Sequence, residues 1–333
     1  MHCQGNSQKS SKNRLSFEVK INATEVDMTN QIRSVAAKIG FKSKRIIKKE
    51  PLRNDFICVG KYRDKDVLFK ITSNKNKKIV ELMKKEAAVD SILNKSVSKI
   101  SVPRILLFGR NKNFSWIIRE YIEGKSLSSD MKAYDNINHD FNNKTEIVLP
   151  KIIKIIRSFH DLKINPKLKS LGVRFDPEIE HLISPKLIQN IGLDVDKLVK
   201  FYNSFRREYL SKKNLRVIMR DFNPGNLIIN QKKNYQIYIS DLSWVCLDNY
   251  LMDVTYFWFF LWRLPSWQNF LLEQFIKNNN DKKNFQACVI RQGLSFGWQD
   301  DKMIKNPIHL SRHKAWRRYI KAAGDSFDKM TTL

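Results

Sequence analysis

The sequence predicts an α+β protein with two parts, a small antiparallel sheet followed by a mostly helical region. Between residues 44 and 124, short apolar runs alternate with polar turns, which is typical of hairpins. After Gly124, apolar residues recur at helical spacing over long segments such as 148–162 and 194–213. Two short strand-like stretches, 216–230 and 235–244, interrupt these helices.

The predicted elements of the first part follow from these runs. The strands are expected at 44–50, 55–62, 67–72, 102–110 and 115–124, and a helix at 77–94. The polar turn "RDKD" joins the second and third strands as a hairpin. We therefore predict an N-terminal extension at 1–43, polar and flexible to about residue 28 with a short helix at 28–40. A sheet lobe at 44–121 and a helical lobe at 122–333 follow it.

The most apolar segment of the helical part is "VTYFWFFLWRL" at 254–264. It is too short to span a bilayer and it contains an arginine, so it predicts a buried core helix. Its aromatic residues come at helical spacing, which favours a core role over base stacking. Breaks are expected at "LPS" (264–266) and "GWQDD" (297–301).

Composition and charge limit the function classes. Four cysteines lie far apart without metal-ligand spacing, and the start of the sequence has no apolar signal segment, so we expect a reducing, cytoplasmic environment. The net charge of +28 would suit nucleic-acid binding, but the basic residues are spread along the whole chain among many asparagines. Since no nucleic-acid-binding motif accompanies them, a dedicated nucleic-acid role is not predicted.

A lysine in an apolar strand is the first candidate site residue. Lys70 lies in the middle of "VLFKI", where an unpaired ammonium group would be costly. It therefore needs anionic partners, which a glutamate and the phosphates of ATP would supply. Glu86 in the following helix is one candidate, and Glu81 is the other.

Two oxygen-bearing side chains on a tight turn are the second candidate. Asp221 and Asn226 are joined by Phe-Asn-Pro-Gly, which allows both side chains to face one cavity. Asp241 ends a strand that could pair with "NLIIN". A second carboxylate beside the turn suits Mg²⁺. Taken alone, Asp, Asn, Pro and Gly are also ordinary turn residues.

The ordered set resembles one known family. "RDFNPGNLII" followed by "ISDLSWVCLDNYLMD" resembles the aminoglycoside phosphotransferase/choline kinase-like family, which has a protein-kinase-like fold. "SWIIREYIEGKSL" resembles the hinge of that family, "IIRSFHDL" its LxxLH helix, and "EAAVDSIL…VPRILLFG" the elements before the hinge. The similarity runs from about 45 to 265.

The resemblance implies a role for each matching residue. Asp221 would be the catalytic aspartate, and Asn226 and Asp241 would hold Mg²⁺. Lys70 would contact the α- and β-phosphates of ATP and be braced by Glu86. The backbone of Glu120 and Ile122 would bind adenine. Asp253 would brace the catalytic loop, and His160 would pack under that loop rather than bind metal.

The sequence also departs from the family pattern. Met219 and Arg220 replace the usual His-Gly before the catalytic aspartate, and Asn223 replaces a common histidine. The phosphate-covering hairpin has only Gly60. A weakly catalytic, nucleotide-binding regulatory protein therefore stays an alternative. A protein kinase is a weaker alternative, because no APE-like element follows Asp241. A third is a basic scaffold for RNA or anionic lipid.

The expected activity is transfer of phosphate from ATP, with Mg²⁺, to a hydroxyl group of a small molecule. The acceptor is set by the most variable part of the family, so the sequence defines it only by charge. With 61 basic and 33 acidic residues, the chain favours a neutral or anionic hydroxylated metabolite over a cationic drug.

Overall fold

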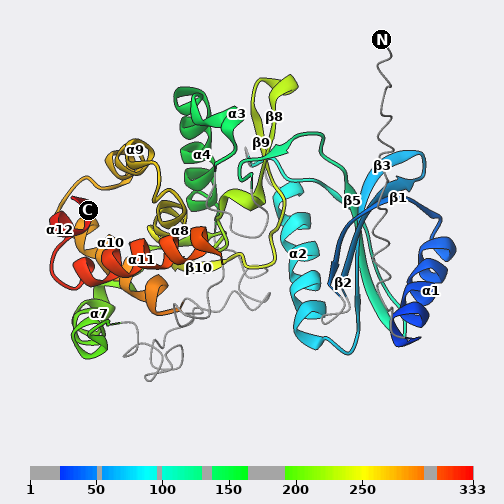
Figure 1. Ribbon diagram of the computed structural model, residues 1–333, viewed down its shortest axis with the longest axis horizontal. Helices are drawn as coiled ribbons and strands as arrows, with labels where there is room; N and C mark the ends of the chain where they lie inside the picture. The colour runs from blue at the N-terminus through cyan, green and yellow to red at the C-terminus, as the bar shows by residue number, and fades with distance from the viewer. Residues whose placement is uncertain are drawn as a thin grey trace, which may run out of the picture.

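Two lobes make up the structure, one built on a sheet and one built mainly of helices (Figure 1). The computed structural model describes residues 23–50, 55–95, 100–129, 137–163, 192–295 and 306–332. The predicted flexible segment before residue 23 and the predicted break at 297–301 lie outside these residues.

The sheet lobe contains five antiparallel strands in the order β1-β2-β3-β5-β4. They are β1 (Phe41–Glu50), β2 (Asp55–Tyr62), β3 (Lys65–Ser73), β4 (Ile105–Arg110) and β5 (Phe114–Glu120). Tyr62 pairs with Lys65, so Arg63 and Asp64 form a two-residue hairpin turn, and both have the positive φ that such a turn requires. The predicted hairpin is confirmed.

Two helices cover opposite faces of this sheet, α1 (Ala23–Lys38) and α2 (Lys77–Lys95) (Figure 1). Successive side chains of a strand point to opposite faces, so Phe69 of β3 packs in the same apolar cluster as Ile32 of α1. Lys70 then faces α2, where it bonds to Glu86. The alternation along β3 therefore sends an apolar side chain to one helix and the lysine to the other.

The helical lobe holds the remaining elements. Its helices are α3 (His139–Asn142), α4 (Thr145–His160), α7 (Val195–Tyr209), α8 (Met252–Phe260), α9 (Pro265–Phe275), α10 (Asn279–Ser295), α11 (Pro307–Ala323) and α12 (Phe327–Thr331). Its short strands are β6 (Lys125–Ser126), β7 (Leu215–Ile218), β8 (Leu227–Asn230), β9 (Gln236–Ile239) and β10 (Cys246–Asn249), with single 3₁₀ turns at Pro224–Asn226 and Gln231–Lys233.

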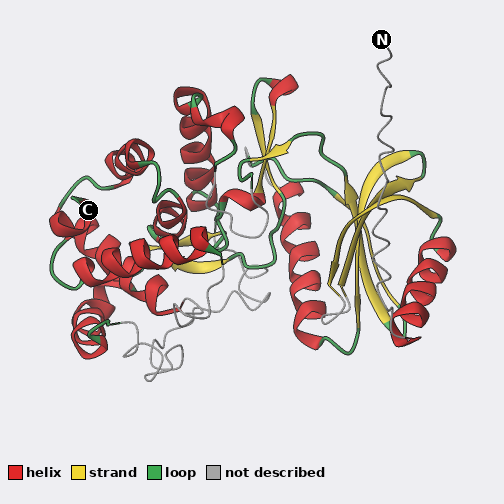
Figure 2. Ribbon diagram, viewed as in Figure 1, coloured by secondary structure: helices red, strands yellow, loops and turns green. Residues whose placement is uncertain are grey.

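The short strands form two small sheets that position the loops between them (Figure 2). β8 pairs with β9 through the Gln231–Lys233 turn, as the sequence predicts, and β6 pairs with the other edge of β8. β7 pairs with β10, which the sequence does not predict. The segments 219–226 and 240–245 therefore both leave strand ends that the small sheets fix.

Apolar spacing explains the core of the helical lobe. α4 buries residues on one face, including Val148, Ile152 and Phe159. α8 is buried nearly all round, and Phe257 and Phe259 are inaccessible to solvent. The interpretation of this apolar segment as a core helix is confirmed. Within the residues that the structure describes, no helix is long and apolar enough to cross a membrane.

Element ends differ from the predictions by a few residues. The first helix begins at Ala23 rather than at 28, and the strand predicted at 44–50 begins at Phe41. α7 ends at Tyr209, before the polar "SKK" that was predicted to continue it, because Leu210 caps the helix through bonds to Arg206 and Glu208 carbonyls. The last strand of the sheet lobe ends at Glu120 rather than at 124.

Candidate active site

Lys70 and Glu86 form a buried ion pair between the sheet and α2. Nζ of Lys70 lies 3.2 Å from Oε2 of Glu86, whose side chain is 2% exposed. Burial lowers the pKa of Lys70, but the charges of Glu86 and Asp241 outweigh it and leave that pKa above its usual value. The lysine therefore stays charged, which the predicted contact with phosphate requires.

The structure distinguishes the two glutamates that the sequence left open. The side chain of Glu81 is 68% exposed and pairs with Lys84 one turn along the same helix. Glu86 is the partner of Lys70 because it lies on the face of α2 that packs on β3.

Arg119 is a second cation on Glu86, and it was not singled out from the sequence. Its Nη1 donates to Oε1 of Glu86 at 2.8 Å and also to the carbonyl oxygen of Ser240. The available signal was the same as for Lys70, a charged residue inside an apolar strand ("SWIIRE"). Arg119 lies in the segment that resembles the family's hinge.

Asp221 lies at the start of the turn that joins β7 to β8. Its Oδ1 accepts a hydrogen bond from Nδ2 of Asn223 at 2.8 Å, and its Oδ2 accepts one from Nδ2 of Asn226 at 2.9 Å. Burial and the nearby charge of Asp241 raise the pKa of Asp221, against these hydrogen bonds. The predicted pair is thus in direct contact, and Asn223 orients the carboxylate from the other side.

Asp253 holds the loop that precedes Asp221. Its Oδ2 accepts from the backbone N–H of Met219 at 2.8 Å and its Oδ1 from that of Arg220 at 2.7 Å. Arg220 has φ = 64°, a left-handed conformation that costs a non-glycine residue roughly 1–2 kcal/mol. The geometry agrees with the bracing role expected of Asp253.

The guanidinium group of Arg220 is bound as well. Its Nη1 lies 3.1 Å from Oδ2 of Asp248, a buried carboxylate that also accepts from Arg291 and from the hydroxyl of Tyr209. Asp248 belongs to β10, the strand that pairs with β7. The loop is therefore fixed through both the backbone and the side chain of Arg220.

Asp241 and Asn226 supply the oxygen atoms suited to a magnesium ion. Oδ1 of Asp241 accepts from the backbone N–H and hydroxyl of Ser243, whereas no described residue bonds its Oδ2. The amide nitrogen of Asn226 donates to Asp221, so its amide oxygen is the atom that the predicted metal contact would use.

The charge of Asp241 also suits a magnesium ion. Burial raises the pKa of Asp241, but Lys70, the Ser243 bonds and Arg119 outweigh it and leave that pKa below its usual value. Among the described residues no group of three or more His, Cys, Asp or Glu side chains could hold a metal ion. Mg²⁺ suits what is present, since it commonly takes one or two protein ligands together with phosphate oxygens and water.

The segment after β5 is the predicted adenine-binding hinge. Glu120 ends β5, and its carboxylate accepts from the backbone N–H of Arg104 and lies near that residue's guanidinium group. The Glu120 side chain is therefore occupied by the sheet edge. The backbone N–H of Glu120 donates to the carbonyl oxygen of Arg104, whereas no described residue bonds the backbone of Ile122. The use of these backbone groups for adenine stays a prediction.

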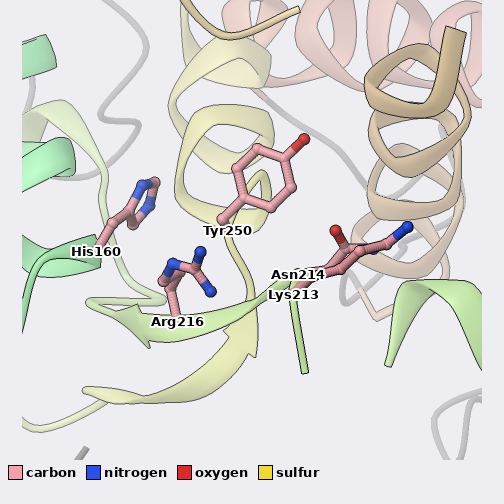
Figure 3. A pocket seen from close by; sticks show the side chains of 5 residues that line it. All are labelled: His160, Lys213, Asn214, Arg216 and Tyr250. Atoms are coloured by element: carbon pink, nitrogen blue, oxygen red, sulfur yellow. The ribbon is translucent and has the colours of Figure 1, made fainter. Parts of the chain in front are cut away.

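His160 ends α4 beside the strands that support the loop. Its ring packs edge-on against Tyr250 and Phe275, and burial, with Arg216 and Arg157 nearby, lowers its pKa to about 4. It lines a pocket of about 330 Å³ with Lys213, Asn214, Arg216 and Tyr250 (Figure 3). None of the predicted site residues lines this pocket, which is separate from the candidate active site.

These features define a class of protein, a two-lobed enzyme with a protein-kinase-like fold. The model of the "Phosphotransferase enzyme family" matches residues 60–286, more than half of the chain. The chain belongs to this phosphotransferase family. A search of curated protein sequences found no match.

Solved structures of similar fold include several small-molecule kinases. Aminoglycoside phosphotransferase APH(4)-Ia has a TM-score of 0.60 at 10% identity, over 87% of this chain and 98% of that one. Spectinomycin phosphotransferase APH(9)-Ia, in complex with ADP and spectinomycin, has 0.54 at 14% identity over 90% and 98%. Choline kinase LicA from Streptococcus pneumoniae has 0.51 at 12% identity over 87% and 97%. These similarities show the fold.

Proposed function

We propose that the protein transfers the γ-phosphate of ATP, with Mg²⁺, to a hydroxyl group of a small molecule. The observation that carries the proposal is the single cluster of charges formed by Lys70, Glu86, Asp221 and Asp241. Lys70 bonds Glu86, and Arg119 links Glu86 to the carbonyl of Ser240, the residue before Asp241. The backbone N–H of Ser240 donates to the carbonyl of Asn226, whose side chain bonds Asp221.

The proposed reaction needs little covalent chemistry from the protein. The acceptor oxygen bonds to the γ-phosphorus, the bond from that phosphorus to the β–γ bridging oxygen breaks, and ADP leaves with the electron pair. Asp221 orients the acceptor hydroxyl and takes its proton. Lys70 binds the α- and β-phosphates, and the backbone at Glu120 and Ile122 orients adenine. Asn226 and Asp241 would hold Mg²⁺, which would supply charge neutralisation at the phosphates.

The fixed position of the base supports catalysis rather than binding alone. Both carboxylate oxygens of Asp221 are hydrogen-bonded by amides of the same turn, so the side chain is preorganised at little further entropic cost. The substitutions at Met219 and Arg220 do not disturb this arrangement, because Asp253 bonds the backbone of both residues.

The acceptor is proposed to be a neutral or anionic hydroxylated metabolite. The chain has 61 basic and 33 acidic residues, so its long-range field attracts anions and disfavours polycations. One protein of similar fold, at 14% identity, binds spectinomycin, but this does not identify spectinomycin as the acceptor here. It supports only a small-molecule acceptor here.

The test is phosphate transfer from γ-labelled ATP and Mg²⁺ to a deproteinised metabolite extract. Wild type is compared with Asp221→Ala and with Asp196→Ala, which removes an exposed acid of α7. Label in a small molecule with wild type and the control, but not with Asp221→Ala, is expected. Label on protein would indicate a protein kinase. ATP binding without transfer would refute catalysis and favour a regulatory role.

A further inference from the structure

Arg119 joins the two lobes at the candidate active site. It belongs to β5 of the sheet lobe, and its side chain is only 12% exposed. One nitrogen, Nη1, donates both to Oε1 of Glu86 and to the carbonyl oxygen of Ser240. Ser240 directly precedes Asp241, so the guanidinium group spans from α2 to the segment that carries the metal-side carboxylate.

Glu86 is therefore shared between two cations. Its Oε2 accepts from Lys70 at 3.2 Å and its Oε1 from Arg119 at 2.8 Å. A carboxylate that is 2% exposed and bonded on both oxygens stays in place, because an uncompensated buried charge would be costly. Since Glu86 must balance two cations, Lys70 keeps positive charge available for phosphate.

The second contact of Arg119 is a backbone carbonyl, which fixes position rather than charge balance. Ser240 also donates its backbone N–H to the carbonyl of Asn226, so the segment bonded by Arg119 is hydrogen-bonded to the catalytic turn. A guanidinium group can hold two acceptors in a fixed geometry, whereas an ammonium group on a flexible stem is a point charge. Arginine is thus suited to this bridge in a way that lysine is not.

We propose that Arg119 is a positioning residue that links α2 to the Ser240–Asp241 segment. By this link it holds the phosphate-side cation Lys70 and the metal-side carboxylate Asp241 in one arrangement across the lobes. The inference rests on the proposed function, since it assigns Arg119 to the binding of Mg²⁺·ATP. Asp241 lies near the charge of Arg119 as well as that of Lys70, which supports the assignment.

The experiment compares Arg119→Lys and Arg119→Met with wild type. Calorimetry measures the dissociation constant of ATP with and without Mg²⁺, and the ratio gives the enhancement by the metal. Arg119→Met is expected to weaken Mg²⁺·ATP binding about tenfold, roughly 1.4 kcal/mol. Arg119→Lys keeps the charge, so it should retain metal-free affinity but lose most of the enhancement. Arg110→Met, at an exposed arginine of β4, is the matched control and should match wild type.

A double-mutant cycle tests the route through Glu86. If Arg119 acts through this carboxylate, Arg119→Met and Glu86→Gln should be non-additive in Mg²⁺·ATP affinity, because removal of either breaks the same bridge. Additive effects would overturn the link. Wild-type metal enhancement in Arg119→Lys would also overturn it, because charge alone would then suffice. That variant decides the matter if Arg119→Met folds poorly.

Hydrogen–deuterium exchange of the free protein separates this inference from the proposed function. The amides of residues 240–245 should exchange faster in Arg119→Lys and Arg119→Met than in wild type or Arg110→Met. Unchanged exchange would refute the link even if ATP binds. If the two Arg119 variants exchange faster but the wild-type protein binds no ATP, the link would be supported and the proposed function refuted.

Discussion

Asp253→Asn tests how the catalytic loop is held. The carboxylate of Asp253 is fully buried and accepts one backbone N–H on each oxygen, from Met219 and from Arg220. An asparagine has one oxygen and one NH₂ group, so only one of these N–H groups can stay bonded. The other would face a second donor and lose its partner.

The expected change in the free energy of unfolding of Asp253→Asn is the difference of two opposing contributions. An unpaired buried N–H group costs about 1–3 kcal/mol. Burial raises the pKa of Asp253 to about 7, so a neutral amide recovers part of the cost of burying charge. We expect a net loss of about 1–2 kcal/mol in the free energy of unfolding. Arg220 at φ = 64° would lose a bond that holds it, and Asp221 directly follows it.

The assay measures urea unfolding and phosphate-transfer kinetics of the same variant. A displacement of about 1 Å at the base can cost roughly 100-fold in rate, so kcat should fall by about that factor. KM for ATP should change less than kcat, because Lys70 and Glu86 lie in the other lobe and only Asn226 of the proposed Mg²⁺·ATP site lies in the displaced turn. Asp281→Asn is the matched control, since that buried aspartate of α10 accepts from the Tyr250 hydroxyl and a backbone N–H.

Comparing Asp253→Asn with Asp281→Asn shows whether a fall in kcat comes from lost stability or from lost positioning of Asp221. Asp281→Asn is expected to lose similar stability with kcat unchanged. If both variants lower kcat equally, the loss would reflect general destabilisation. If Asp253→Asn keeps wild-type kcat, the two bonds to the loop do not position Asp221, and the bracing argument is refuted.

Two further predictions concern stability. The pKa of His160 is lowered from 6.5 to about 4, so the unfolded chain binds a proton first as pH falls, and stability is lost between these values by up to about 3 kcal/mol. His160→Gln should lose less stability between pH 7 and pH 4.5 in urea titrations, and an equal pH dependence would contradict the assignment. Gly60→Ala would place Cβ 2.2 Å from the carbonyl oxygen of Lys42, so the two strands must move apart. We expect a loss of about 1–3 kcal/mol, and an unchanged midpoint would show that the strands adjust freely.

The sheet lobe was predictable because its signals are local. Alternation along β2 and β3, with a polar turn between them, sets both the hairpin and the face to which Lys70 points. Helical spacing alone allowed Glu81 and Glu86 as its partner. The choice depends on which face of α2 packs on the sheet, and that is a tertiary fact.

The supports of the catalytic loop were less visible because they are distant in sequence and polar. β10 reads "CLDN", with none of the β-branched residues typical of strands, and it forms by pairing with β7. Its buried Asp248 is compensated by Arg220 and Arg291, which lie 28 and 43 residues away along the chain. A sequence pattern that covers only neighbouring residues therefore cannot predict such a network.

Arg220 shows why a departure from a family pattern need not change the chemistry. The family's glycine at this place suits a left-handed conformation, and Arg220 adopts that conformation with φ = 64°. The backbone geometry is therefore kept at a conformational cost. Bonds from its amide to Asp253 and from its guanidinium group to Asp248 offset that cost. A glycine would avoid the cost but could not bind Asp248, which would then rely on Arg291 and Tyr209. Arg220 therefore carries a conformational cost that a glycine would not, but it adds a link between the catalytic loop and β10.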